Sequence, residues 1–451
     1  MIPKPGKNSF LPGFFMPMKQ NLPTTYSDCL KSMYSLRRFG IKLGLSTIQQ
    51  ILSALGNPQH RYACIHVAGT NGKGSVASFL ASILNASGYK VGLYTSPHLV
   101  RFNERICVNN QQISDENVVS AYRAVTNVHG GDREPTFFEY TTAMALYEFD
   151  RQAVDWAVVE TGMGGRLDAT NVLQPVLSII TNVSVEHEAY LGKTLAEIAG
   201  EKGGIIKRNT PVVTAVSQPS AISVLENLAS ELSAPLFRLK KDFSVRRNAN
   251  HTFSYYGLSH TWRGITTSLT GSHQVENAAL VLAACELLKR RDTIISLKHI
   301  QTGLENTRWP GRLEVVSDHP MIILDGAHNL SACKVLAKYL NTELKDRRIT
   351  LVIGILDDKP YTAILECLLH VCSQVILTSP KIDRALPVDT LYPIAAALTA
   401  DVRKIPDVSH AIAFAVQNAQ PEDVICVAGS LYVVGEAKAF LNQSEEGVQY
   451  M

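Results

Sequence analysis

The sequence predicts an α/β protein with two unequal domains, a parallel-sheet domain that carries a glycine-rich loop and a smaller Rossmann-like domain after it. Short apolar, β-branched runs alternate with helical stretches, which is the pattern of parallel strands joined by crossover helices. The stretch "HVAGTNGKGSVA" at 66–77 places three glycines and a lysine between an expected strand and an expected helix. The 451 residues are enough for two or three separate cores.

The first block of strands and helices extends to about residue 300. A helix is expected over 72–88, because apolar residues recur there at helical spacing and Gly88 is a natural stop. Short apolar runs predict buried strands at 61–69, 90–96, 154–160 and 176–183.

The second block begins within "NTRWPGRLEVV", where Pro310 and Gly311 mark the expected hinge. No GxGxxG fingerprint follows its strands, so a dinucleotide site is not predicted. Strands are predicted at 321–325, 349–355, 374–379 and 424–429, with helices at 331–340 and 361–371.

The expected domain boundaries follow from these two blocks. The first 20 residues contain four prolines and no continuous apolar core, so they predict neither a signal peptide nor a helix. We expect a flexible N-terminal extension at 1–24, a first domain at 25–305 and a second domain at 306–451.

Composition and charge exclude several classes of protein. The formal net charge is only +3, too balanced to indicate nucleic acid or a charged membrane surface as a partner. No run of about 18 apolar residues exists, so no transmembrane helix is predicted. The eight cysteines include no CxxC pair, which favours buried thiols in a reducing cytosol over disulfides or zinc.

The glycine-rich loop resembles a phosphate-binding loop with altered spacing. The usual pattern would place a glycine and a hydroxyl where this chain has Val67 and Gly74, and Ser75 comes one step later. Glycines let the backbone approach an anion closely, free N–H groups at a helix start favour phosphate, and Lys73 adds positive charge. The alternative is a tight strand-to-helix turn with an exposed lysine.

A second glycine-rich stretch, "VVETGMGGRLDATN" at 158–171, begins with a carboxylate. Glu160 ends an expected buried strand, where parallel sheets place their ligands, and a carboxylate there suits Mg²⁺. Arg166 and Asp168 could hold polar groups. By itself, Glu160 is equally compatible with a helix cap or a salt bridge.

Two further polar residues follow in the first domain. His187 lies in a loop after another strand, where a histidine is more often structural than a metal ligand. Thr194 and Glu197 form a capping box that begins a helix. Lys202 lies on that helix and by itself is an ordinary surface lysine.

The second domain places polar residues at the end of one strand and at the hinge. Asp325 ends an expected strand and is followed by His328 and Asn329. A turn with side-chain capping is the alternative to a site there. Arg312 lies at the hinge, from which it could reach across to a bound nucleotide.

Ten stretches occur in an order that is more specific than any one of them. They are "HVAGTNGKGS", "YTSPHLVRFNERI", "FFEYTT", "ETGMGGRLDATN", "EHEAYLG", "EKGGIIK", "HQVENA", "PGRLE", "LDGAHN" and "GSLYVVGE". Together they resemble the folylpolyglutamate synthase and dihydrofolate synthase family, within the Mur ligase superfamily. The resemblance covers about residues 25–440.

The resemblance implies an ATP-dependent ligase that forms C–N bonds, adding L-glutamate to dihydropteroate and to reduced folates. A P-loop ATPase domain would bind nucleotide and pterin, and the smaller Rossmann-like domain would help to bind glutamate. The acceptor carboxylate would attack the γ-phosphate of ATP, and the amine of glutamate would then attack the acyl phosphate. ATP, two Mg²⁺ ions, a monomer and a cytoplasmic location are also implied, with neither nucleic acid nor membrane as a partner.

The resemblance further assigns roles to residues by their place in the motifs. Lys73, Lys202 and His328 would serve in catalysis. The ATP site would comprise Thr70, Asn71, Gly72, Lys73, Gly74, Ser75, Asn277, Arg312 and Asp325. Magnesium would be held by Ser96, Glu160, His187 and a carbamylated Lys202, so that Ser96 supplies the hydroxyl from outside the loop. The pterin would contact Gly40, Ile41, Lys42, Phe137, Phe138, Glu139, Tyr140, Leu167, Asp168 and Ala169.

Three positions depart from the family pattern. Glu186 stands before the motif histidine, where an aspartate is common, and Gly203 stands where alanine is common. Glycine within a helix weakens it by up to about 1 kcal/mol relative to alanine. Lys42 stands where the family often has a negative residue, which affects the expected pterin contacts.

Two rival functions remain compatible with parts of the sequence. A cell-wall Mur ligase would share the nucleotide motifs, but "SPHLVRFNERI" matches the folate branch. An ATP-binding regulatory protein with a decayed site would have lost chemistry-bearing residues, yet Lys73, Glu160, His187 and Lys202 are all present.

Overall fold

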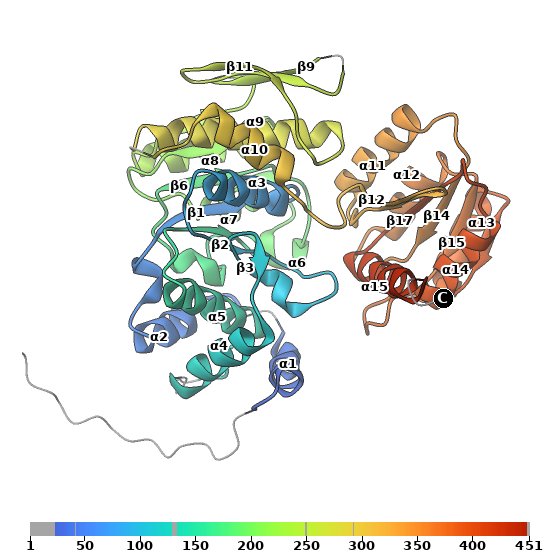
Figure 1. The fold of residues 1–451 in the computed structure, drawn as a ribbon, viewed down its shortest axis with the longest axis horizontal. Coiled ribbons are helices and arrows are strands. Elements are labelled where there is room, and N and C mark those ends of the chain that lie inside the picture. The colour runs from blue at the N-terminus through green and yellow to red at the C-terminus, as the bar shows by residue number, and fades with distance from the viewer. Residues whose placement is uncertain (1–22, 41, 129–132, 249, 292, 449–451) are drawn as a thin grey trace, which may run out of the picture.

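The computed structural model describes residues 23–448, apart from 41, 129–132, 249 and 292 (Figure 1). Almost all of the predicted N-terminal extension, and Ile41 among the pterin residues, therefore lie outside the described residues. Within the described part, two separate parallel-rich sheets confirm the predicted α/β class. No described helix is both long enough and apolar enough to cross a bilayer.

The first domain is built on an eight-stranded sheet of order β4-β3-β2-β5-β1-β6-β7-β8. All four strands predicted there are confirmed, and only β3 runs opposite to the rest, pairing antiparallel with β2 and with β4. The strands are β1 (Ala63–Ala68), β2 (Val91–Tyr94), β3 (Ile106–Val108), β4 (Gln111–Gln112), β5 (Trp156–Glu160), β6 (Leu177–Ile180), β7 (Val212–Thr214) and β8 (Leu236–Arg238).

Helices cover both faces of this sheet and bury it (Figure 1). One face packs against α3 (Lys73–Ala86), α9 (Ser272–Lys289) and α10 (Leu297–Asn306). The other face packs against α1 (Tyr26–Ser35), α2 (Ser46–Ala54), α4 (Asp115–Val128) and α5 (Phe137–Arg151), while α7 (Leu195–Gly203) and α8 (Pro219–Glu231) form a further core. The short helices are η1 (Leu36–Phe39), η2 (Pro58–His60), η3 (Phe102–Arg105), η4 (Ala169–Val172) and α6 (Glu188–Leu191).

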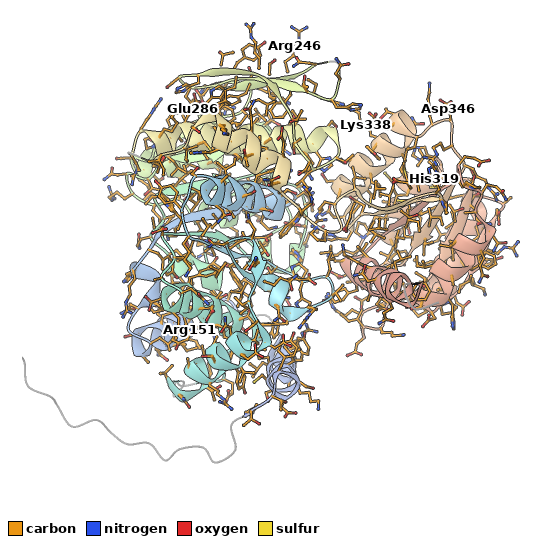
Figure 2. All side chains as sticks on the ribbon, viewed as in Figure 1. Arg151, Arg246, Glu286, His319, Lys338 and Asp346 are labelled. Carbon is orange, nitrogen blue, oxygen red and sulfur yellow. The ribbon has the colours of Figure 1, made fainter. Side chains whose placement is uncertain are left out.

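An antiparallel sheet over α9, formed by β9 (Ser244–Arg247), β10 (Phe253–Tyr256) and β11 (Thr261–Ile265), is not predicted from the sequence (Figure 1). It is anchored by Glu286 of α9 (Figure 2). The buried carboxylate of Glu286 accepts hydrogen bonds from the Tyr255 hydroxyl and from backbone N–H groups around His260. Charged residues interrupt the strands of this sheet, so the sequence contains no apolar run that would predict them.

The second domain has a six-stranded sheet of order β12-β13-β17-β14-β15-β16, in which only β12 is antiparallel. The four predicted strands are confirmed, and β12 and β16 are additional. The strands are β12 (Glu314–Asp318), β13 (Met321–Leu324), β14 (Ile349–Ile353), β15 (Gln374–Leu377), β16 (Val402–Lys404) and β17 (Val424–Ala428). Its helices are α11 (Leu330–Glu343), α12 (Tyr361–Leu369), α13 (Val388–Leu398), α14 (Val408–Asn418) and α15 (Leu431–Val448).

Candidate active site

The glycine-rich loop lies between β1 and α3, at the carboxyl edge of the first sheet. In the register of β1 and β5, Val67 pairs with Glu160, so the loop and this carboxylate emerge side by side. Gly72 adopts a φ of +83° as the N-cap of α3, and a Cβ there would lie 2.6 Å from the Oδ1 atom of Asn277. Only glycine fits this turn, which leaves the N–H groups at the start of α3 facing the cavity described below.

Lys73 is held within the loop. Its Nζ atom donates hydrogen bonds to the carbonyl oxygens of Gly69 and Thr70, at 3.0 and 3.1 Å. The side chain is half-buried, unlike the exposed lysine of the simple-turn alternative. The ammonium group therefore lies over the loop, where a phosphate would be cradled.

Glu160 is 4% exposed and accepts a hydrogen bond from the backbone N–H of Ser96, at 3.2 Å. Burial raises the pKa of its carboxyl, while nearby Lys73 lowers it. No described Lys, Arg or His side chain forms an ion pair with Glu160, so a salt-bridge role for this carboxylate is not supported. A buried carboxylate of this kind is a ligand suited to a hard cation.

Ser96 and His187 lie around the same cavity as Glu160. His187 is the N-cap of α6, and burial lowers the pKa of its imidazole, so the ring is neutral and able to bind a metal. In the described ranges no group of three or more His, Cys, Asp or Glu side chains could hold a metal on its own. The set of Ser96, Glu160 and His187 contains one carboxylate. It fits Mg²⁺, which takes one or two carboxylates and completes its shell with phosphate and water.

Lys202 is not a surface residue, so the expectation of an ordinary surface lysine is wrong. It is 1% exposed, and its Nζ atom donates to the Gly69 carbonyl and to Glu186 Oε1, both at 2.9 Å. Burial lowers the pKa of Lys202 to about 8, although Glu186 acts in the opposite direction. Burial raises the pKa of Glu186, but Lys202 and Lys73 outweigh it and hold that pKa at about 2.

Asp325 and His328, which follow the expected hinge, line the cavity from the second domain. Asp325 is buried and accepts hydrogen bonds from the N–H groups of Leu313 and Ala327, at 2.8 and 2.9 Å. His328 donates from Nδ1 to the carbonyl of Gly326 at 2.7 Å, which leaves Nε2 as an acceptor. Burial lowers the pKa of His328 to about 4, so its ring is neutral. Asp325 and His328 thus bond to the backbone of their own turn and also line the cavity described below.

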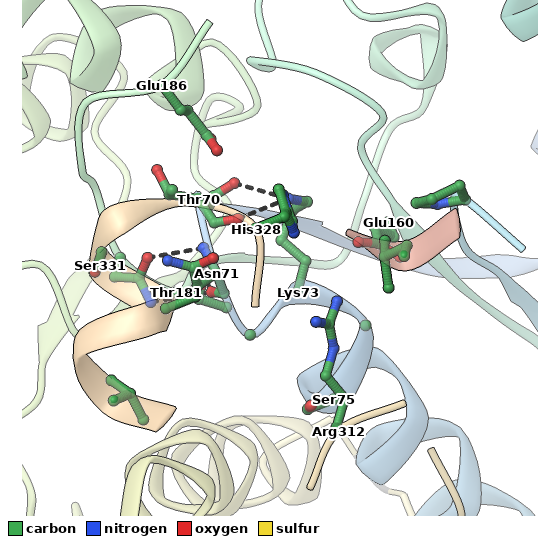
Figure 3. A pocket seen from close by; sticks show the side chains of 18 of the residues that line it. Thr70, Asn71, Lys73, Ser75, Glu160, Thr181, Glu186, Arg312, His328 and Ser331 are labelled. Atoms are coloured by element: carbon green, nitrogen blue, oxygen red, sulfur yellow. Dashed lines mark hydrogen bonds between the residues drawn. The ribbon is translucent and has the colours of Figure 1, made fainter. Parts of the chain in front are cut away.

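One cavity of about 420 Å³ gathers residues from both domains (Figure 3). Every residue predicted for ATP, magnesium or catalysis lines it. From the first domain come Thr70, Asn71, Gly72, Lys73, Gly74, Ser75, Ser96, Glu160, His187, Lys202 and Asn277, and from the hinge and second domain come Arg312, Asp325 and His328.

Among the described residues, those predicted for the pterin do not line this cavity. Phe137 is half-buried at the start of α5, against Tyr34 at a centroid distance of 5.7 Å. Glu139 and Tyr140 are buried, the first in an ion pair with Arg133 and the second hydrogen-bonded to the carbonyl of Tyr122. Gly40 and Lys42 are exposed, Phe138 and Leu167 are half-buried, and Asp168 and Ala169 are buried.

The carboxylate of Asp168 is hydrogen-bonded within its own loop. It accepts hydrogen bonds from the N–H groups of Met163 and Thr170, at 2.8 and 3.0 Å, and from the Thr170 hydroxyl. His66, which is fully buried, shares a 2.8 Å hydrogen bond with that hydroxyl. The structure therefore places Asp168 as the residue that shapes this loop, and a pterin contact for it stays a prediction.

The sequence alone does not single out Arg105, although it lies within the quoted stretch "YTSPHLVRFNERI". Arg105 is 5% exposed, its Nε atom donates to His98 Nδ1 at 2.7 Å, and its Cζ atom lies 5.2 Å from the Phe137 ring. Burial lowers the pKa of His98 to about 3, so the partner is neutral. No carboxylate among the described residues pairs with this guanidinium, which marks it as a candidate anion-binding group.

Comparisons with known proteins agree with this geometry. The Mur ligase middle domain matches residues 67–285, and the Mur ligase glutamate ligase domain matches residues 311–431. The fold and the site thus define a ligase of the Mur type. The chain belongs to the folylpolyglutamate synthase/dihydrofolate synthase family within that class, because it is 38% identical to the Bacillus subtilis dihydrofolate synthase/folylpolyglutamate synthase, over 92% of this chain and 99% of that protein.

Two solved structures extend the similarity to the whole described fold. Escherichia coli FolC in complex with DHPP and ADP has a TM-score of 0.87 at 29% identity, covering 94% of this chain and 99% of that chain. The Yersinia pestis bifunctional folylpolyglutamate synthase/dihydrofolate synthase, complexed with AMPPNP and a manganese ion, has a TM-score of 0.84 at 29% identity. It covers 94% of this chain and all of that chain.

Proposed function

We propose that this protein is an ATP-dependent amide ligase that adds L-glutamate to dihydropteroate and to reduced folates. The observation that carries the proposal is the single cavity shared by both domains, which gathers a phosphate loop, a buried carboxylate and a buried lysine. The nucleotides and DHPP bound by the E. coli and Y. pestis relatives support the same substrates here.

On the nucleotide side, Lys73 and the N–H groups at the start of α3 would hold the phosphates. Asn277 and Arg312 would contact the remainder of ATP, and Asp325 would fix the backbone of the hinge beside Arg312. Ser96, Glu160 and His187 would hold Mg²⁺, which would neutralise charge on the transferring phosphate.

On the acceptor side, Phe137 and Tyr34 offer aromatic faces for planar rings. Arg37 lies over both rings, with its Cζ atom 4.3 Å from the Tyr34 centroid and 5.0 Å from the Phe137 centroid. Arg105 would attract the acceptor's carboxylate to the side of the cavity near Glu160; burial raises the pKa of Glu160, and the charge of Arg105 partly opposes that rise. Glutamate would enter from the second domain, beside His328 and Lys359.

The reaction then proceeds in two balanced steps. An oxygen of the acceptor carboxylate attacks the γ-phosphorus of ATP, the bond to the β-phosphate oxygen breaks, and ADP leaves. The amine of glutamate attacks the acyl carbon, loses a proton, and expels inorganic phosphate, so an amide bond replaces the acyl phosphate. Exclusion of water from the cavity would protect the acyl phosphate between the steps.

We expect the enzyme to be bifunctional. Both acceptors end in a carboxylate that can occupy one activation site, and "TSPHLVRFNERI" with "FFEYTT" resembles the two-activity members of the family. Steady-state assays of glutamate incorporation should show turnover with dihydropteroate and with tetrahydrofolate. No turnover on dihydropteroate would restrict the protein to polyglutamylation, and turnover only on a muramyl precursor would reject the folate assignment.

Arg312→Ala should impair catalysis far more than pterin binding. Arg312 lies at the hinge and lines the cavity, so it completes the ATP site from the side of the second domain. Domain closure of this kind commonly assembles the reacting groups. Pterin affinity measured without ATP should be unchanged, as in the control Arg308→Ala in the same linker. Loss of pterin affinity with normal ATP affinity would contradict the assignment.

Arg105→Ala should weaken the binding of dihydropteroate, measured without ATP, by roughly 10- to 100-fold, the effect of losing a buried charged hydrogen bond. The matched control is Arg101→Ala in the same motif, because Arg101 is exposed and pairs with Asp115. Its affinity for dihydropteroate should stay normal. Equal affinities in the two variants would exclude Arg105 from the acceptor site.

We also propose that the protein acts as a monomer in the cytoplasm. None of the eight cysteines is paired in a disulfide, which fits a reducing compartment. The residues predicted for ATP, magnesium and catalysis all line one cavity of a single chain, so no second copy is needed to bring them together.

A further inference from the structure

A pair of asparagine side chains joins the two domains at the mouth of the phosphate loop. The Nδ2 atom of Asn71 donates to Asn329 Oδ1 at 3.3 Å, and the Nδ2 atom of Asn329 donates to Asn71 Oδ1 at 3.0 Å. Asn71 lies in the loop before α3, and Asn329 is the N-cap of α11. Figure 3 shows Asn71 next to the start of the helix that carries Ser331.

Each member of this pair is anchored in its own domain. Asn329 Oδ1 accepts a hydrogen bond from the N–H of Ala332 at 2.9 Å, which fixes the amide so that Nδ2 faces Asn71. The backbone N–H of Asn71 donates to Asn182 Oδ1 at 2.9 Å, and its carbonyl accepts from the Thr181 hydroxyl at 2.6 Å. The pair, which we call the amide clasp, therefore connects two rigid supports.

The amide clasp ties the phosphate loop to the start of α11. Asn71 precedes Lys73 by two residues, and Asn329 directly follows His328. Asn71 therefore moves with the phosphate loop, and Asn329 moves with His328 on the side of the cavity where glutamate would enter. Both amides are neutral, so the clasp can tie the domains together without competing with phosphate for the charge on Lys73. Asn329 is 7% exposed, and shielding from water strengthens such hydrogen bonds.

We propose that Asn329 is a positioning residue that acts through Asn71 to align the two domains for the second step. With the clasp intact, the amine of glutamate reaches the acyl phosphate before water does. Without it, a water oxygen attacks the acyl carbon, the bond to the phosphate oxygen breaks, and the acceptor carboxylate and inorganic phosphate are released with ATP consumed. This role rests on the proposed ligase function.

The test is the ratio of phosphate released to glutamate incorporated, measured in Asn329→Ser. Serine retains a neutral oxygen that can cap α11 but is too short to reach Asn71. The unchanged protein should give a ratio near one. The variant should raise the ratio by about 2- to 10-fold, the effect of losing one or two net hydrogen bonds, and should raise the KM for glutamate with ATP affinity unchanged.

Two controls separate the clasp from helix capping. Asn329→Ala loses both the cap and the clasp, so a ratio equal to that of Asn329→Ser assigns the effect to the clasp. Asp407→Ala removes the N-cap of α14, in the same domain and outside the cavity, where Asp407 accepts from the N–H of His410 at 3.0 Å. Its ratio should stay near one.

The partner variant completes the test. Asn71→Ala should also raise the ratio, and the double variant Asn71→Ala with Asn329→Ser should be no worse than the worse single variant, because both remove one interaction. A ratio near one in Asn329→Ser, or effects that multiply in the double variant, would overturn the clasp. Failure of the unchanged protein to incorporate glutamate would instead reject the ligase function itself.

Discussion

Replacing Lys73 with alanine is expected to lower kcat for both acceptors by roughly 10²- to 10³-fold, the usual effect of removing one electrostatic donor from a reacting centre. The Nζ atom of Lys73 rests on the carbonyls of Gly69 and Thr70, directly over the loop. Phosphoryl transfer depends almost entirely on positioning and charge stabilisation. Both acceptors use the same γ-phosphate, so both activities should fall together.

The matched control for this variant is Lys338→Ala. Lys338 is an exposed lysine on α11 (Figure 2). It is not among the residues that line the cavity. It should retain normal turnover, and both variants should unfold at the temperature of the unchanged protein. Near-normal turnover of a well-folded Lys73→Ala protein would show that the glycine-rich loop is only a turn.

Lys202→Arg is expected to abolish activity almost completely. The resemblance to the family suggests that Lys202 is carbamylated and serves as an anionic partner of a second Mg²⁺. Carbon dioxide reacts with a neutral amine, and burial lowers the pKa of Lys202 to about 8, which makes that form accessible. The product is an oxygen-bearing anion, the kind of ligand that magnesium prefers. Arginine keeps the positive charge but cannot form the carbamate.

The alternative role for Lys202 is the ion pair with Glu186, whose atoms lie 2.9 Å apart in the unmodified chain. Under that role, Lys202→Arg would preserve the charge and retain activity. Under the carbamate role, Lys202→Ala should be inactive and partly rescued by short added carboxylates, whereas Lys202→Arg should not be rescued. A fully active Lys202→Arg protein would reject the carbamate.

The sequence predicts the central parallel strands, such as β1 and β17, because each is a short apolar run between turn residues. It misses the parallel strands β7, β8 and β16, which lie toward the sheet edges. The same logic misses β9 and β11, since Arg246, Arg247 and Arg263 interrupt their apolar pattern. The sheet that these strands form with β10 is anchored by contacts distant in sequence, the hydrogen bonds from Tyr255 and His260 to Glu286. Local sequence patterns do not predict such long-range contacts.

In the candidate site, too, some residues are predicted from local sequence and others become apparent only from the packing of distant elements. Glycine spacing and strand ends predict Lys73 and Glu160 from local sequence, and the structure places both around one cavity. Burial cannot be read from a single helix, so Lys202 resembles a surface lysine until α7 packs against the phosphate loop. Arg105 is similar, because its lack of a carboxylate partner in the described chain becomes visible only in three dimensions.

The most direct test of the central claim follows the oxygen atoms of the acceptor. Dihydropteroate labelled with heavy oxygen in its carboxylate would be incubated with ATP, Mg²⁺, L-glutamate and the unchanged protein, and the released phosphate would be analysed by mass spectrometry. An acyl phosphate predicts that each phosphate carries one labelled oxygen, because the bridging oxygen leaves with phosphorus when the amine attacks. Amide formation with unlabelled phosphate would contradict the proposed mechanism.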